Sequence, residues 1–183
     1  MRPYRKAIET IAVPWAARHG FSRASAHVFH RAANVLGVVE VIEIQKSCKH
    51  PHRTFTINLG LYHPSFTTAP SPSSTDIASI HCARRIRLGH VMPKHFWSRL
   101  VLWFWFGSGW HWWQLIPGDF WWAYRDTDDS LSRAMSDALS QVTRYGLPWF
   151  EQFSSLQDAT EVFDRSRFSL NESAGFFPQP HNG

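Results

Sequence analysis

The sequence predicts a single α+β domain with an N-terminal helix, an antiparallel sheet of about four strands, and C-terminal helices packed on one face of the sheet. Strand-like segments gather in the first half of the chain and helical patterns lie at its ends, whereas a parallel sheet would need helices between its strands. One segment also alternates strictly between apolar and polar residues, which is typical of an antiparallel sheet with one buried face.

The first helix is expected over residues 3–19, where apolar side chains recur at helical spacing: Tyr4, Ile8, Ile11 and Trp15. Pro14 lies inside this pattern and is expected to kink or shorten the helix. Gly20 is a natural C-terminal stop.

Four strands follow from residue type and alternation, over residues 26–32, 38–46, 53–62 and 80–88. The third is the clearest, because four apolar side chains point one way: Phe55, Ile57, Leu59 and Leu61. Arg84 falls on the apolar side of the fourth strand, which predicts a place at the edge of the sheet or a pairing with an acid.

A C-terminal helix is expected to begin at a cap supplied by Asp126 or Thr127. Its apolar stripe consists of Leu131, Met135, Leu139 and Val142. Gly146 and Pro148 are expected to end it, since glycine favours helix ends and proline cannot continue a helix.

These elements place residues 1–167 in one domain. Residues 64–79 are rich in Pro, Ser and Thr and are expected to form a mobile loop within the domain, because a strand resumes after them. Residues 168–183 are expected to form a disordered tail.

Composition narrows the class of protein. Hydrophobic residues make up 44% and charged residues 18%, which excludes a chain that is disordered throughout. The net charge of +5 favours acidic partners, such as nucleic acid, an anionic membrane surface or an acidic protein, although a mildly basic enzyme remains an alternative. Two cysteines are too few for a disulfide framework and indicate a reducing, cytoplasmic compartment. We expect no signal peptide and no transmembrane helix.

Several motifs stand in the order of a known bacterial pattern. They are His19-Gly20-Phe21-Ser22-Arg23, the strand that ends Gln45-Lys46-Ser47, the strand around Asn58-Leu59-Gly60, and Tyr145-Gly146-Leu147-Pro148-Trp149. In these motifs the chain resembles the uncharacterised domain-of-unknown-function family 4304 over most of residues 5–165. The resemblance implies a fold and a bacterial, cytosolic setting, and it implies no mechanism.

The polar side of the predicted sheet is the first candidate site. Alternation places five polar side chains there, if the strand faces coincide: Glu43, Gln45, Asn58, Arg85 and Arg87. Two arginines beside amides suit the capture of a carboxylate or a phosphate. The alternative is an ordinary solvated face, or a face covered by the C-terminal helices with Glu43 paired to an arginine.

Eight tryptophans lie between residues 96 and 122, and a hypothetical aromatic patch comprises Trp105, Trp110, Trp112 and Trp113. Aromatic side chains anchor protein interfaces and stack on bases of single-stranded nucleic acid. The alternative is that most of them cover the sheet as core, although a core does not easily absorb so many.

Cysteine and histidine offer two weaker candidates. Cys48, His50 and His52, with His63 or His81, have ligand types that suit zinc, but a second cysteine pair at zinc spacing is missing. Cys82 is a conceivable nucleophile with His81 or His111 as its base, but it lies on the apolar side of its strand and is expected to be a buried structural thiol. We therefore assign no metal, no cofactor and no catalytic residue.

The expected function is a non-enzymatic binding module for a protein partner, of which a toxin-neutralising protein would be one example by analogy. Recognisable catalytic motifs are missing from the sequence, while tryptophan and basic polar residues are abundant. Two alternatives remain: a nucleic-acid-binding protein that uses Arg85, Arg87 and the aromatic residues, and an enzyme with a site on the polar face of the sheet.

Overall fold

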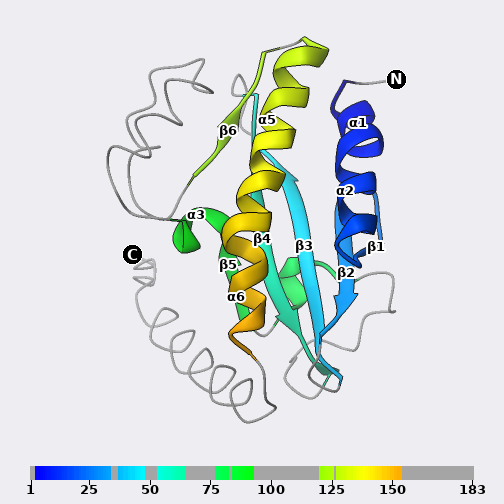
Figure 1. Ribbon diagram of the computed structural model, residues 1–183, viewed down its shortest axis with the longest axis vertical. Coiled ribbons are helices and arrows are strands. Elements are labelled where there is room, and N and C mark those ends of the chain that lie inside the picture. The colour runs from blue at the N-terminus through cyan, green and yellow to red at the C-terminus, as the bar shows by residue number, and fades with distance from the viewer. Residues whose placement is uncertain are drawn as a thin grey trace, which may run out of the picture.

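The computed structural model describes residues 3–33, 37–47, 53–64, 77–82, 84–92, 120–125 and 127–153. In these residues, an antiparallel sheet carries an N-terminal and a C-terminal helical segment on one of its faces (Figure 1). This arrangement confirms the predicted α+β class. None of the described helices is long and apolar enough to span a membrane.

The sheet runs in the order β1-β2-β3-β4-β5, with every neighbouring pair antiparallel. β6 pairs with the first residues of β4. The strands are β1 (Ser22–Arg23), β2 (Val28–Ala32), β3 (Val39–Lys46), β4 (Thr54–Tyr62), β5 (Arg84–Arg87) and β6 (Trp122–Ala123). The four predicted strands correspond to β2–β5, and the two further strands, each of two residues, were too short for alternation to reveal.

The fourth strand is shorter than predicted. Residues Ser79–His81 form a 3-10 turn, η3, and β5 begins only at Arg84. The backbone N–H of Ala78 donates to Nδ1 of His81 at 3.0 Å, which closes the turn. His81 and Cys82 therefore lie outside the strand to which the sequence assigned them.

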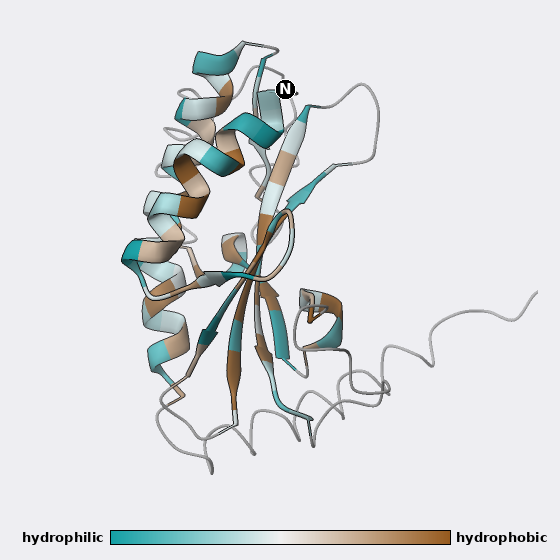
Figure 2. Cartoon of the chain, turned by 90° about the vertical axis from the view of Figure 1, so that its right-hand side faces the viewer, coloured by the Kyte–Doolittle hydropathy of each residue, from teal (hydrophilic) through white to brown (hydrophobic). Residues whose placement is uncertain are grey.

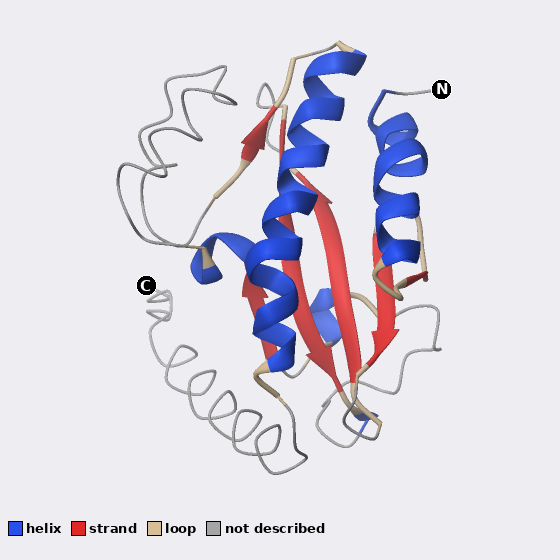
Figure 3. Ribbon diagram, viewed as in Figure 1, coloured by secondary structure: helices blue, strands red, loops and turns tan. Residues whose placement is uncertain are grey.

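Two long helical segments lie side by side on the sheet (Figure 3). The first comprises α1 (Pro3–Ala7), a π-helical turn η1 (Ile8–Ala12) and α2 (Val13–Arg18). The second comprises α5 (Asp128–Gln141), a π-helical turn η5 (Val142–Gly146) and α6 (Leu147–Glu151). Thr127, one of the two caps that the sequence predicts, caps α5 by accepting from the backbone N–H of Ser130. A short helix, α3 (Leu88–Val91), follows β5.

The prediction that Gly146 and Pro148 end the second helix is wrong. A π-turn precedes the proline in each segment, so that Val13 N–H donates to Ile8 O and Leu147 N–H donates to Val142 O. Pro14 and Pro148 then occupy the first turn of the next α-helical stretch, where a missing N–H costs least. The helical path continues in both cases.

Gly146 serves close packing instead of helix termination. A Cβ at this position would lie 3.1 Å from Val142 Cγ1 and 3.3 Å from Leu59 Cδ1. The absence of a side chain therefore lets η5 approach β4. By contrast, Gly20 has a φ of 76°, and it ends the first segment as predicted.

The main core lies between the helices and the sheet. The four predicted apolar residues of β4 are all buried there, at 1% exposure or less: Phe55, Ile57, Leu59 and Leu61. In Figure 2 the hydrophobic side of the helices is turned toward the sheet. Trp122 stacks on Phe55 with ring centroids 5.9 Å apart, and its Nε1 donates to Asp137 at 2.8 Å. This contact joins β4, β6 and α5.

A partly buried ion pair joins β2 and β3 on the helix side of the sheet. Arg31 and Glu40 are directly opposite each other on β2 and β3, and Arg31 Nε donates to Glu40 Oε2 at 2.6 Å. The same guanidinium lies 4.5 Å from the centre of the Phe21 ring and donates to the carbonyl of His19. Burial raises the pKa of Glu40, and the nearby Arg31 guanidinium offsets this only in part.

The raised pKa gives a testable pH dependence. The folded protein binds a proton at Glu40 more tightly than the unfolded chain does, so this carboxyl stabilises the fold most below its unfolded pKa of 4.5. That contribution is lost as the pH rises through the folded pKa. We expect the stability of the wild type relative to Glu40→Gln to increase from about pH 7 to about pH 4.5. Urea unfolding at each pH measures it.

A relative stability that falls over the same pH range would contradict this expectation. It would mean that attraction to Arg31 outweighs the burial of the carboxylate.

Candidate functional site

The five residues of the predicted polar site lie on one face of the sheet, opposite the helices. We call this the polar face. In the register, Glu43 of β3 is opposite Asn58 of β4, and Asn58 is opposite Arg87 of β5. Gln45 lies one pair further along β3, opposite Thr56, and Arg85 is opposite Gly60. The strand faces therefore coincide, which sequence alternation could only assume. The two long helical segments lie on the other side, so within the described residues the C-terminal helices do not cover the polar face.

Asn58 forms the centre of this row. Its Nδ2 donates to Gln45 Oε1 at 2.9 Å, and the residue is 1% exposed. Its Oδ1 is buried and accepts no hydrogen bond. A buried acceptor without a partner costs the free energy of its lost hydration, on the order of 1–3 kcal/mol. Asn58 is therefore a local weakness of the fold.

Glu43 interacts with a hydroxyl and a histidine. The Ser79 hydroxyl donates to Glu43 Oε2, and His27 Nε2 lies 3.9 Å from Oε1. Ser79 is completely buried. A serine nucleophile needs an accessible oxygen and a base to remove its proton. Here the hydroxyl instead points at a carboxylate, which makes the contact a structural one.

Residues 77–82, which include η3, cross the polar face, and we call them the 77–82 segment. At its start, a ring N–H of His30 donates to the Ile77 carbonyl, with Nε2 2.6 Å from the oxygen. The Ile77 side chain is buried in a second, smaller cluster on this face, together with Val28, Val41 and Tyr62. Ser79 then binds Glu43. The segment is thus attached to β2, β3 and β4.

The end of the 77–82 segment reaches β4 at a glycine. A Cβ at position 60 would overlap Cys82 Sγ and lie 2.9 Å from Cys82 Cβ. Only glycine leaves room for this approach. The sequence signal that could have indicated this contact is an isolated glycine within an alternating strand.

Cys82 is a free cysteine and a poor nucleophile. Burial, and to a lesser extent the charge of Glu43, raises the pKa of its thiol to about 12, and Arg85 opposes this only weakly. The thiolate is the reactive form, so the thiol is inert near neutral pH. Nδ1 of His81 is engaged by Ala78 N–H within the turn. The prediction of a structural thiol is consistent with this geometry, although Cys82 packs on the polar side and not in the main core.

Arg85 and Arg87 of β5 differ in their contacts and in their exposure to solvent. The Arg87 guanidinium lies 5.2 Å from the centre of the Trp121 ring. Burial lowers the pKa of Arg87, and repulsion by Arg85 lowers it further. Arg85 is exposed. Arg85 and Arg87 therefore form a positively charged end of the polar face beside the Trp121 ring. We call these two residues the cationic margin.

Other sequence candidates fall outside the described residues. These are the proposed aromatic patch, namely Trp105, Trp110, Trp112 and Trp113, and also Cys48, His50, His52 and His111. The predicted loop at 64–79 lies there too, except for its two ends. Among the residues that the structure describes, no three His, Cys, Asp or Glu side chains come close enough to hold a metal ion.

Sequence reasoning missed His30, Ser79 and the attachment of the 77–82 segment. Ser79 stands at the end of a Pro- and Ser-rich stretch that carries no periodicity. The ring of His30 donates to a backbone carbonyl that lies 47 residues away along the chain, so only the folded structure reveals this contact. Neither contact leaves a local sequence signal.

A comparison with models of known protein families finds a match. The model of the family described as "Domain of unknown function (DUF4304)" matches residues 11–152, which is well over half of the chain. No curated protein and no solved structure gives a significant match.

The close approach at Gly60 predicts the effect of adding one carbon. Gly60→Ala should destabilise the protein by about 1–3 kcal/mol, because Cys82 must move. Cys82→Ala in the same chain should recover part of this loss, since it removes Sγ. Urea unfolding of the two single variants and the double variant measures the coupling. An equal cost of Gly60→Ala with and without Cys82→Ala would disprove the contact.

The unpaired oxygen of Asn58 predicts unusual tolerance at a buried position. Asn58→Val should change the free energy of unfolding by no more than about 1 kcal/mol, because it removes an amide that is only half satisfied. The neighbouring Ile57→Ala, which faces the main core, should cost about 2–5 kcal/mol. If both variants lose similar stability in thermal unfolding, Oδ1 has a hydrogen-bond partner after all.

Proposed function

We propose that this chain, which belongs to the family described as "Domain of unknown function (DUF4304)", is a module that binds a protein partner on its polar face. That face carries the 77–82 segment and the cationic margin of β5. The helices bury their apolar sides against the opposite face of the sheet.

Ile80 is the observation that carries the proposal. Its side chain is 70% exposed, and it is the one large hydrophobic side chain exposed among the described residues. A single exposed apolar residue is ordinary in itself. Ile80, however, lies in a turn that is fixed by the contacts of Ile77, Ser79 and Cys82. A rigid apolar side chain that projects from the surface loses little entropy on binding and is suited to anchor an interface.

Charge indicates the kind of partner. The chain carries a net charge of +5, and Arg85 and Arg87 lie on the same face as the 77–82 segment. An acidic protein surface with an apolar depression would complement this arrangement, and the charges would accelerate the encounter. Neutralisation of an acidic toxin is one form that such binding would take. The free thiol of Cys82 fits a reducing, cytoplasmic setting.

Binding is favoured over catalysis by the state of the nucleophiles on this face. Burial keeps the Cys82 thiol protonated, and the Ser79 hydroxyl is buried against Glu43. A nucleic-acid partner is the second possibility that has structural support, because the guanidinium of Arg87 lies over the Trp121 ring. Arginine beside an aromatic ring also suits the stacking of bases.

Ile80→Asp tests the proposal. It should weaken binding of the natural partner by about tenfold or more, because a charge replaces an apolar anchor. The partner is first captured by the full-length chain from nuclease-treated extracts of cells that express it, and affinity is then measured by calorimetry. Ser136→Asp is the matched control, because it adds the same charge at an exposed position of α5. It should leave the affinity unchanged.

Three results would contradict the proposal. Ile80→Asp and Ser136→Asp could have the same affinity as the wild type. Material could be captured from untreated extracts and not from nuclease-treated ones. The affinity could fall steeply and log-linearly with salt concentration, which is typical of nucleic-acid binding.

A further inference from the structure

β5 lies at one edge of the sheet that the described residues form. β5 is the last strand in the sheet order, and its strand partner there is β4. Figure 3 shows β5 at the margin of the sheet. An edge of this kind presents backbone N–H and C=O groups that can pair with another extended chain.

Three of the four residues of β5 are arginines, and they point to both sides of the sheet. Arg84 is opposite Leu61 and therefore on the helix side, whereas Arg85 and Arg87 are opposite Gly60 and Asn58 on the polar side. Within the described residues, neither Arg84 nor Arg85 forms an ion pair or a side-chain hydrogen bond. Burial lowers the pKa of Arg87, and repulsion by Arg85 lowers it further. Positive charge therefore accumulates along this edge.

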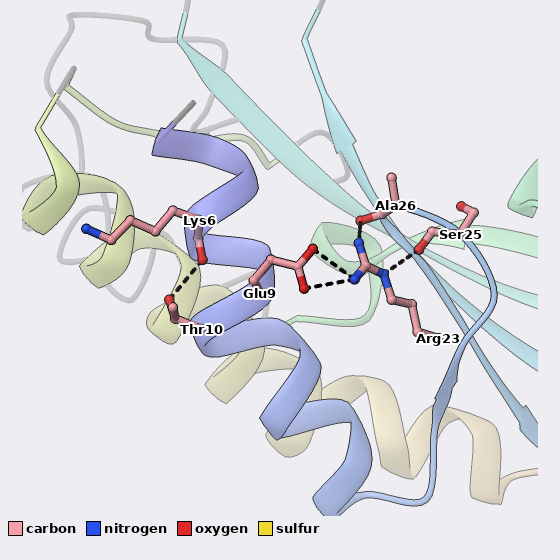
Figure 4. Close-up of polar contacts among 6 residues, drawn as sticks. All are labelled: Lys6, Glu9, Thr10, Arg23, Ser25 and Ala26. Atoms are coloured by element: carbon pink, nitrogen blue, oxygen red, sulfur yellow. Dashed lines mark hydrogen bonds and ion pairs between the residues drawn. The ribbon is translucent and has the colours of Figure 1, made fainter. Parts of the chain in front are cut away.

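The opposite edge of the sheet shows how the same chain neutralises an arginine internally. Arg23 of β1 donates to both carboxylate oxygens of Glu9 at 2.9 Å, and to the carbonyls of Ser25 and Ala26 (Figure 4). Glu9 comes from the helix that packs beside β1. For Arg84 and Arg85, the described residues supply no such acid.

We propose that the edge of β5 pairs with an extended, acidic segment of the protein partner, which adds a strand to the sheet. This inference rests on the proposed function and specifies how the partner binds. An added strand would lie about 4.8 Å from β5, with its side chains in cross-strand pairs with the arginines. Acidic residues on both faces of that strand would meet Arg84 on one side and Arg85 on the other. The planar guanidinium group is well matched to carboxylates.

The geometry distinguishes strand pairing from simple charge attraction. Strand pairing needs the backbone N–H groups of the bound segment, whereas charge attraction does not. A peptide of about eight residues that repeats Glu-Glu-Val-Val, with blocked ends, serves as the probe, because neighbouring glutamates point to opposite faces of a strand. The same peptide with N-methylated alternate amides keeps every charge and loses the hydrogen bonds. A third peptide replaces glutamate with lysine.

The experiment measures peptide affinity and amide hydrogen exchange of the full-length protein by NMR. The glutamate peptide should bind and slow exchange in Arg84–Arg87, and the other two peptides should do neither. Replacing Arg84 and Arg85 together with glutamine should weaken binding about tenfold. The matched control is Arg18→Gln with Arg133→Gln, which removes two charges from exposed helix positions and should change nothing.

Equal binding of the glutamate peptide and its N-methylated form would overturn the inference, and so would equal weakening by the two double variants. Loss of solubility in the Arg84 and Arg85 variant with unchanged peptide affinity would also overturn it, because the arginines would then only protect the edge from aggregation. These results are independent of Ile80. If the peptides fail while Ile80→Asp abolishes capture of the natural partner, the proposed function stands and only the role of the edge is rejected.

Discussion

The fold depends on β4 being buried on both sides. All nine of its residues are buried, with the apolar set facing the helices and Thr54, Thr56, Asn58 and Tyr62 facing the opposite side. Because side chains alternate with a period of two, a slip of one residue against β3 or β5 would exchange the two sets. Such a slip would place polar groups in the main core. The register of β4 therefore determines the positions of its neighbours on both faces.

The polar face follows from this register and from the absence of a side chain at Gly60. The 77–82 segment can approach β4 there. Its Ser79 hydroxyl donates to Glu43 of β3, and its Ile77 carbonyl accepts from His30 of β2. These contacts bury the Ser79 hydroxyl, which a catalytic nucleophile would have to expose, whereas Ile80 stays exposed. Asn58 keeps an unpaired oxygen in the same region. We therefore propose partner binding, and not catalysis, for this face.

The five residues of the candidate site were predictable because strand alternation is a local property. Asn58 and Arg87 belong to separate strands, yet the antiparallel register brings them opposite each other. The contacts of Ser79 and His30 were not predictable, because each joins segments that are far apart in sequence and have no shared period. The role of the tryptophans between residues 96 and 119 stays a prediction, since those residues lie outside the described part of the chain.

The sequence by itself determined the class of the fold, the apolar side of β4 and a cap for α5 at Asp126 or Thr127. Each of these depends on neighbours within a few residues. Only the tertiary structure decided that the helices cover the apolar face, that the second helical segment continues past Pro148, and that Gly146 packs on Leu59. Packing against the sheet stabilises a π-turn that local propensity disfavours. A residue that favours a helix end in isolation can therefore lie inside a helix when burial on the sheet contributes more free energy.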